Sequence, residues 1–275
     1  MKKRLVTLLI FLIILAFQTQ TIAQFKPEEI AEDEKWEDFL MTAEVVDQKQ
    51  MSGREAVTSP WKLSLEKEGI NRDALWKNPE GRMKGFVEGW KYEIASYRLD
   101  RYLGLNMVPV TVEKEFQGNR GSCQLWITAK MDLRKKVKDK IKTPSYKVWY
   151  WNNATYLHRA FDNLIANEDR HQGNILITDD WRMILIDHSR SFRTDKKFTN
   201  KLIYTEKHKE GPKLMRKLPR AFFDKLKTLN FEVVKGVVGE YLTDKEIEAV
   251  ITRKDLILKE IDKFIKKYGE DDVLY

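Results

Sequence analysis

Asp169, Asn174 and Asp187 flank the apolar runs of the stretch "DRHQGNILITDDWRMILIDHS", which covers residues 169–189. Its two apolar runs, "NILIT" and "RMILID", are joined by "DDW" and are typical of a small β-hairpin. Asn174 precedes the first strand and Asp187 closes the second, so both are expected at the open end of the hairpin. Asp169 is expected close to them, at the end of the preceding helix.

This arrangement of carboxylates points to a bound cation. Two carboxylates held ~5 Å apart repel each other by roughly 3 kcal/mol at an effective dielectric constant of about 20, unless a proton or a cation intervenes. Asn174 and Asp187 supply oxygen ligands of the kind that Mg²⁺ or Mn²⁺ takes, and Mg²⁺ completes its octahedron with water and phosphate oxygens. The pattern therefore predicts a Mg²⁺ or Mn²⁺ site, with phosphoryl transfer as the reaction class.

The chain ahead of this stretch is rich in short extended segments. Between Val45 and about Lys77, three strands joined by turns are expected, and Trp61, Leu63 and Leu65 alternate there with polar residues. Two more strands are predicted around the turn "QGNRG". The first half of the chain is therefore mostly β.

One helix interrupts these strands. Apolar residues recur at helical spacing in residues 92–102, Gly104 suits a left-handed C-terminal cap, and Pro109 follows. A single amphipathic helix is predicted here.

The second half of the chain is predicted to be helical. A capping box from Thr243 to Glu246 begins one helix. A second helix, with a buried face, runs into the opening stretch and is marked by Leu157, Ala160, Phe161, Leu164 and Ile165.

The fold class that follows is α+β, with a β-rich N-terminal lobe containing one key helix and a mostly helical C-terminal lobe. The junction is expected near Ala129. The predicted divisions are a signal peptide at 1–23, an N-terminal arm at 24–44, the nucleotide-binding lobe at 45–129 and the catalytic lobe at 130–275.

The first residues have the features of an export signal. Lys2, Lys3 and Arg4 precede an apolar run from Leu5 to Phe17. As a helix this run reaches only ~20 Å, short of the ~30 Å hydrocarbon core, and the polar "QTQT" then ends it. Cleavage is preferred over a retained anchor, which places the protein outside the cytoplasm, in the periplasm or secreted.

Composition limits the remaining possibilities. A single cysteine, Cys123, excludes an intrachain disulfide and an all-cysteine metal cluster. The net charge of +8 favours anionic partners only weakly, and the basic residues 130–142 are interpreted as a solvated face, with an anion-binding surface as the alternative. No nucleic acid is expected as a partner, and an anionic membrane surface is a candidate for peripheral contact.

The block "DRHQGN", with its hairpin and second aspartate, resembles the catalytic core of the protein-kinase-like superfamily. The order "DRH" is similar to the branch of phosphatidylinositol 3- and 4-kinases, HipA-type kinases and secretory-pathway kinases of the Golgi casein kinase type. "ALWKNPEG" resembles the strand with that family's phosphate-binding lysine, and "YEIASYRLDRYLGLNMVP" resembles its glutamate-bearing helix. The resemblance covers about residues 45–195 and implies a kinase-like fold with ATP as phosphoryl donor.

The resemblance implies a role for each matching residue. Lys77 would hold the α- and β-phosphates of the nucleotide, and Glu93 would pair with Lys77. Asp169 would accept the proton of the acceptor hydroxyl, while Asn174 and Asp187 would bind the metal. A solvated side chain is the alternative for both Lys77 and Glu93.

Further contacts to the nucleotide are implied outside this set. "SGREAVTSP" would cover the phosphates, with Gly53 and Thr58 as its contacts, and a hinge containing Trp126 and Thr128 would meet the adenine. His171 is a candidate for assisting proton transfer, with a structural histidine as the alternative. The acceptor is a hydroxyl on protein, glycan or lipid, and the sequence does not choose among them.

Departures from the family pattern keep other functions open. The position of the family's "DFG" reads "DHS", the phosphate loop lacks G-x-G-x-x-G, and no activation segment is identifiable. The alternative is therefore an inactive pseudokinase that binds a nucleotide or a partner. A zinc hydrolase using His158, His171 and His188 is disfavoured, because no H-E-x-x-H pattern is present.

Overall fold

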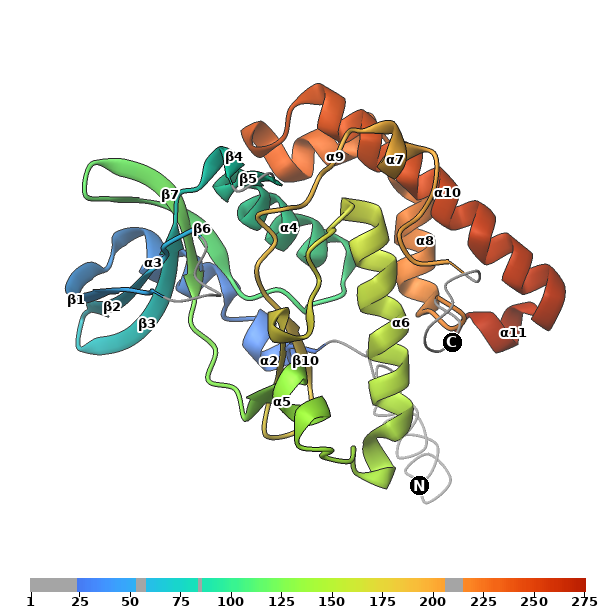
Figure 1. Cartoon of the computed structure of the whole chain (residues 1–275), viewed down its shortest axis with the longest axis horizontal. Helices are drawn as coiled ribbons and strands as arrows, with labels where there is room; N and C mark the ends of the chain where they lie inside the picture. Colours follow the sequence, from blue (N-terminus) through green and yellow to red (C-terminus); the bar gives the residue numbers. More distant parts are fainter. Residues whose placement is uncertain (1–23, 53–57, 84–85, 206–214) are drawn as a thin grey trace, which may run out of the picture.

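The computed structural model describes residues 24–52, 58–83, 86–205 and 215–275. The predicted export signal and Gly53 lie outside the described residues. Figure 1 shows two lobes, with the larger sheet on one side and the long helices α6 and α10 on the other. This arrangement confirms the predicted α+β, two-lobed fold class.

Five antiparallel strands form the N-terminal sheet in the order β1-β2-β3-β7-β6. Leu63 and Leu65 of β2 are buried and their neighbours are half-exposed, which is the period-two pattern of a strand with one face on a core. Glu68 and Gly69 both have positive φ, as a two-residue hairpin loop between β2 and β3 requires. The strands are β1 (Glu44–Gln50), β2 (Trp61–Lys67), β3 (Ile70–Lys77), β6 (Thr111–Phe116) and β7 (Asn119–Leu125).

The segment predicted as an arm forms the helices α2 (Pro27–Ile30) and α3 (Asp33–Thr42). Phe39 and Leu40 of α3 are buried in the core of the N-terminal lobe. The ammonium of Lys114 on β6 donates to the backbone carbonyl of Ala43 at 2.9 Å. Helix α3 therefore packs against the sheet.

A short antiparallel hairpin, β4 (Glu80–Met83) and β5 (Phe86–Gly89), precedes the helix of this lobe. The sequence analysis predicted no strands here. The helix α4 (Trp90–Leu103) ends at Gly104, whose φ of 74° gives the predicted left-handed cap. Helix α4 contacts β6 and β7 on one side and the C-terminal helices α8 and α9 on the other, so it joins the two lobes.

The C-terminal lobe is built around α6 (Val148–Ile165) and α10 (Asp244–Tyr268). Helix α10 begins with the predicted capping box, in which Thr243 and Glu246 bond each other's backbone N–H groups. The predicted hairpin is present as β9 and β10, with Ile175 opposite Leu185. The other elements are α5 (Leu133–Lys138), α7 (Lys196–Thr199), α8 (Arg220–Thr228), α9 (Phe231–Val238), α11 (Glu270–Val273), β8 (Met131–Asp132), β9 (Ile175–Ile177) and β10 (Met183–Leu185).

One hydrophobic core extends through both lobes, from Leu63 in β2 to Phe264 in α10. Within the described ranges, no helix combines the length and the apolar character needed to cross a membrane.

Candidate active site

The loop that follows α6 is organised by Arg170, the arginine of the "DRH" block. Its guanidinium is buried and contacts the buried carboxylate of Asp162 on α6 at 3.1 Å. The same guanidinium donates to the backbone carbonyls of Asn174 at 3.0 Å and of Ile186 at 2.6 Å. Arg170 therefore ties the end of α6 to both strands of the hairpin at their open end, where the predicted site residues lie.

The hairpin places Asn174 and Asp187 together, as its sequence pattern predicts. The N–H of Ile186 donates to the carbonyl of Asn174 at 3.2 Å, so Asp187 follows directly on the residue paired with Asn174. The amide nitrogen of Asn174 donates to the backbone carbonyl of Asp169 at 3.0 Å. Because that nitrogen is used within the loop, the amide oxygen is the atom that a cation would take.

The amine of Lys77 reaches this site from the other lobe. Lys77 ends β3, and its Nζ lies 2.7 Å from Oε1 of Glu93 on α4 and 2.8 Å from Oδ1 of Asp187. The side chains of Lys77 and Glu93 are buried, whereas that of Asp187 is 33% exposed. The ammonium of Lys77 thus links strand β3 of the sheet, helix α4 and the end of the β9–β10 hairpin.

Burial and charge act in opposite directions on the buried pair. Burial alone would lower the pKa of Lys77, but the carboxylates of Asp187 and Glu93 raise that pKa above its ordinary value. Burial would raise the pKa of Glu93, but the ammonium of Lys77 and the imidazole of His188, whose Nδ1 lies 3.6 Å from Oε2, hold that pKa below its ordinary value. Both groups are therefore charged at neutral pH.

A second polar network contains residues that the sequence analysis missed. Glu88, buried in β5, accepts hydrogen bonds from Ser189 Oγ and Arg190 Nε, each at 2.6 Å. Arg190 also places its Nη1 at 3.1 Å from Oδ2 of Asp169, and Ser189 Oγ lies 3.3 Å from Oδ1 of Asp187. The only available signal was the proximity of "SR" to Asp187 in the sequence, because nothing marks Glu88 as its partner.

The environment of Asp169 suits a proton acceptor. Burial raises the pKa of Asp169, the guanidinium of Arg190 opposes this rise, and the charge of Asp187 adds to it. A carboxylate whose pKa is raised is a better base than an ordinary aspartate, provided that it remains ionised.

The histidines have separate environments. His171 is exposed, and its Nδ1 accepts the N–H of Gly173 at 3.1 Å, which agrees with a structural role in the loop. His158 and His188 are buried, and burial lowers the pKa of both, that of His158 to about 3. Within the part of the chain that the structure describes, no group of three or more His, Cys, Asp or Glu is placed to hold a metal.

A cleft of about 520 Å³ lies between the sheet and the hairpin, a volume within the range of about 300–1,000 Å³ typical of ligand sites. Its lining is mostly apolar and includes Leu75 of β3, Trp126, Thr128 and Ile186. The predicted hinge residues thus face a cavity that could hold a base. Thr58 lies in the connection between β1 and β2 and is not among the lining residues of this cleft.

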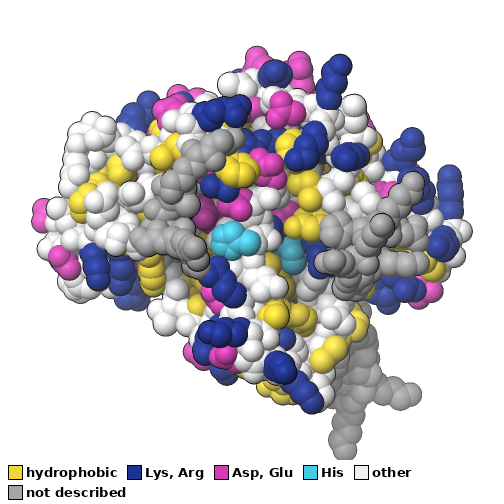
Figure 2. Space-filling model, viewed as in Figure 1, with side chains coloured by type: hydrophobic (Ala, Val, Ile, Leu, Met, Phe, Trp, Pro, Cys, Tyr) yellow, Lys and Arg dark blue, Asp and Glu magenta, His cyan; other side chains and the backbone are white. Residues whose placement is uncertain are grey.

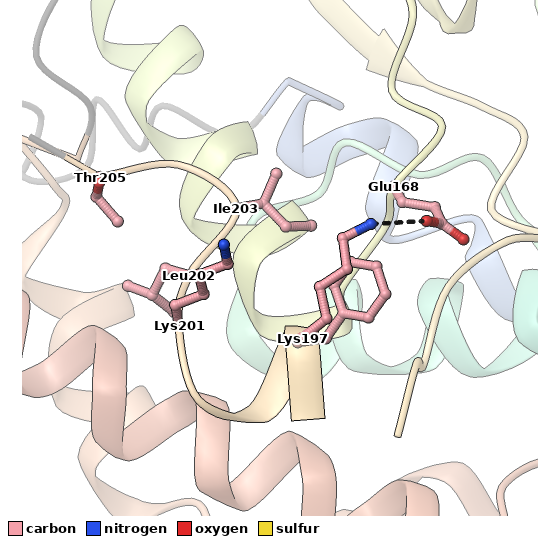
Figure 3. A pocket seen from close by; sticks show the side chains of 7 residues that line it. Glu168, Lys197, Lys201, Leu202, Ile203 and Thr205 are labelled. Atoms are coloured by element: carbon pink, nitrogen blue, oxygen red, sulfur yellow. Dashed lines mark ion pairs between the residues drawn. The ribbon is translucent and has the colours of Figure 1, made fainter. Parts of the chain in front are cut away.

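A second cavity, of about 720 Å³, adjoins Glu168, the residue next to Asp169. Figure 3 shows the amine of Lys197 directed at Glu168, with the two atoms 3.9 Å apart. The remaining lining residues come from α7 and the chain that follows it: Phe198, Lys201, Leu202, Ile203 and Thr205. A molecule in this cavity would approach the loop that carries Asp169.

Asn174 and Asp187 fit a hard divalent cation, because both offer oxygen atoms and Asp187 is partly open to solvent. Figure 2 shows acidic side chains and histidines gathered near the centre of the molecule, where the two lobes meet. The arrangement can hold a nucleotide base in the cleft, phosphates beside Lys77 and a metal at the end of the hairpin.

Comparison with known proteins identifies the fold. No protein-family model and no curated protein matches the chain. The structure of hydra Fam20 with sugar has a TM-score of 0.64 and 16% identity, covering 93% of this chain and 95% of that chain. The Golgi casein kinase with Mn and ADP bound has a TM-score of 0.62 and 15% identity, covering 89% of this chain and 79% of that chain. These structures confirm, at the level of fold, the resemblance seen in the sequence.

Proposed function

We propose that this chain, which has the protein-kinase-like fold, is an exported metal-dependent kinase that transfers the terminal phosphoryl group of ATP to a hydroxyl. The observation that carries the proposal is the position of the Lys77 amine between Glu93 and Asp187, from opposite lobes, at 2.7 Å and 2.8 Å. A buried lysine held by one carboxylate and facing a second one beside a cleft is suited to bind phosphates and a metal together.

Each residue has a distinct part in the proposed reaction. The cleft beside Trp126 and Thr128 would hold the base, and Lys77 would contact the α- and β-phosphates. Asn174 and Asp187 would hold Mg²⁺ or Mn²⁺, which when bound neutralises charge on the phosphates.

Asp169 would orient the acceptor hydroxyl and take its proton. The acceptor oxygen forms a bond to the terminal phosphorus while the bond from that phosphorus to the bridging oxygen of ADP breaks. Arg190, 3.1 Å from Asp169, would hold the carboxylate in position during this step. The cavity beside Glu168 is the proposed entrance for the acceptor, a protein, glycan or lipid hydroxyl.

Export is supported by the leader sequence. The basic residues and the apolar run from Leu5 to Phe17 are typical of an export signal. The fold is also shared with a kinase described as belonging to the Golgi. We therefore place the protein in the periplasm or the extracellular medium after cleavage.

Transfer from labelled ATP to pools of peptides, glycans and phosphoinositides, with Mn²⁺ or Mg²⁺, tests this function. The Asp187→Ala variant should lose at least ~10²-fold in rate, in line with the contribution of a positioned electrostatic group. Asp179→Ala, which removes an exposed carboxylate from the hairpin turn, is the matched control and should keep the wild-type rate. Equal rates for wild type and Asp187→Ala would contradict the proposed function.

A pseudokinase is the second candidate. It is favoured by the departures from the family pattern, which are "DHS" in place of "DFG" and a phosphate loop without G-x-G-x-x-G. This alternative predicts that ATP with Mn²⁺ raises the melting temperature while no acceptor is phosphorylated. Single-turnover measurements with labelled ATP separate the two candidates.

A further inference from the structure

The positive charge of the chain is concentrated in one segment. Residues 130–151 contain eight Lys or Arg and two Asp, a net charge of +6, whereas the whole chain has +8. Without Lys2, Lys3 and Arg4 of the leader, the chain has +5, so the remainder of the folded part is close to neutral. This segment therefore dominates the attraction of the protein for an anionic surface.

The same segment exposes large apolar side chains. Val137 is 53% exposed, Tyr146 72%, Val148 43% and Trp149 51%. Large apolar side chains left in water beside lysines are a combination that marks interaction surfaces. We call this region the basic aromatic surface, and it consists of Val137, Lys138, Lys140, Lys142, Tyr146, Val148 and Trp149.

Ring contacts connect the two elements that form the basic aromatic surface. The amine of Lys136 on α5 lies 5.2 Å from the centre of the Trp151 ring on α6 and 6.0 Å from that of Trp181. Figure 1 shows α5 and the start of α6 together at the lower end of the molecule. Figure 2 shows Lys and Arg side chains beside hydrophobic ones at that end.

We propose that the basic aromatic surface binds an anionic phospholipid membrane. Trp and Tyr side chains prefer the boundary between headgroups and acyl chains, and lysines beside them attract anionic headgroups. An anionic polysaccharide would use the lysines, but it offers no apolar layer for Val137, Val148 and Trp149. The lipid bilayer satisfies both parts of the surface.

Gln24 is bound at the same end of the molecule as the basic aromatic surface. Gln24, the first described residue, accepts the N–H of Met183 at 2.7 Å through its side chain and the guanidinium of Arg182 at 2.9 Å through its backbone carbonyl. These residues follow Trp181, whose ring contacts that of Trp151 at 6.3 Å. Gln24 is thus held close to the start of α6, which carries part of the basic aromatic surface.

The surface also lies next to the nucleotide cleft. Asp132 and Lys135 line the cleft, while Val137 and Lys138, on the same short helix α5, are exposed to solvent. Membrane binding would hold the cleft near the bilayer. The proposal itself does not depend on kinase activity.

Sedimentation with vesicles of phosphatidylcholine alone, and of phosphatidylcholine mixed with phosphatidylglycerol, tests the proposal on the full chain as it is isolated. The triple variant Lys138→Gln/Lys140→Gln/Lys142→Gln should bind the anionic vesicles about a hundredfold more weakly, since each surface lysine contributes about fivefold. Its binding to neutral vesicles should be unchanged. Trp149→Ala should lose about tenfold on both vesicle types, because it removes apolar area.

The matched control is Lys245→Gln/Lys259→Gln/Lys266→Gln, which removes the same charge from exposed positions on α10 and should bind as wild type. An equal loss in both triple variants would overturn the proposal, since it would mean that diffuse charge alone drives binding. Wild-type affinity in the Lys138 triple variant would overturn it too. Binding to heparin but not to vesicles would assign the surface to a polysaccharide instead. The thermal shift with ATP in every variant verifies the fold and reports on the nucleotide site separately.

Discussion

Replacing Lys77 by methionine tests the reasoning about the site most directly. Methionine keeps the length and much of the volume of the lysine stem but carries no charge. The change leaves the buried carboxylate of Glu93 without its lysine partner, although the backbone N–H of His188 still donates to it, and it removes the contact to Asp187. We expect loss of stability as well as loss of nucleotide binding.

The magnitude follows from the distances. At an effective dielectric constant of about 20, unit charges 2.7 Å apart attract by about 6 kcal/mol, and desolvation of both groups offsets much of this gain. Asp187 is one-third exposed, so its contact with Lys77 contributes less to the free energy of unfolding. Removing one partner of a buried pair typically costs about 3–5 kcal/mol, which is the expected loss for Lys77→Met.

Urea unfolding of the apoprotein, extrapolated linearly to water, measures this loss. The double variant Lys77→Met/Glu93→Gln should lose less than Lys77→Met alone, because the buried carboxylate without a counter-charge is also removed. The control is Lys67→Met on the neighbouring strand β2, where the exposed partner Asp38 lies 2.6 Å away. This control should lose less than about 1 kcal/mol.

Two results would refute the reasoning. If Lys77→Met costs no more than Lys67→Met, the amine is not held between the carboxylates as the geometry indicates. If the double variant is less stable than Lys77→Met, the unpaired carboxylate is not the source of the loss.

Three further predictions follow from other contacts. Asp187→Asn should abolish the Mn²⁺-dependent rise in melting temperature with ATP, while Asp179→Asn keeps it; an unchanged rise in Asp187→Asn would remove this residue from the metal site. Burial lowers the pKa of His158 to about 3, so the unfolded state takes up a proton first as the pH falls. The wild type should therefore lose about 2 kcal/mol more than His158→Gln between pH 7 and pH 5, measured by urea unfolding at both values, and parallel losses would contradict the buried neutral histidine. Thr243→Ala should destabilise the protein by about 1 kcal/mol in the same assay, because the capping box of α10 is lost, and an unchanged midpoint would speak against that cap.

The local features of this fold were predictable because they depend on neighbouring residues. The period-two alternation around Leu63 marks a strand, Gly104 supplies the left-handed cap of α4, and Thr243 begins α10. The hairpin that brings Asn174 beside Asp187 was also predictable. In an antiparallel pair, the residue before the first strand lies close to the residues after the second.

The short hairpin β4–β5 was missed, although it is also local. Its strands have four residues each and no strong alternation of apolar and polar residues, so the pattern carries little signal. The importance of this hairpin comes from Glu88, whose partners Ser189 and Arg190 lie more than a hundred positions later in the chain.

By itself, the sequence determined the strands of the larger sheet, the main helices, the two lobes and the convergence of Asn174 with Asp187, because spacing along one segment sets each of these. Only the tertiary structure decided that the Lys77 amine meets Asp187, 110 positions away, and that Arg190 joins Glu88 to Asp169. Such contacts depend on how α4 and the β4–β5 hairpin pack between the lobes, and that packing results from many weak contacts that no short segment encodes.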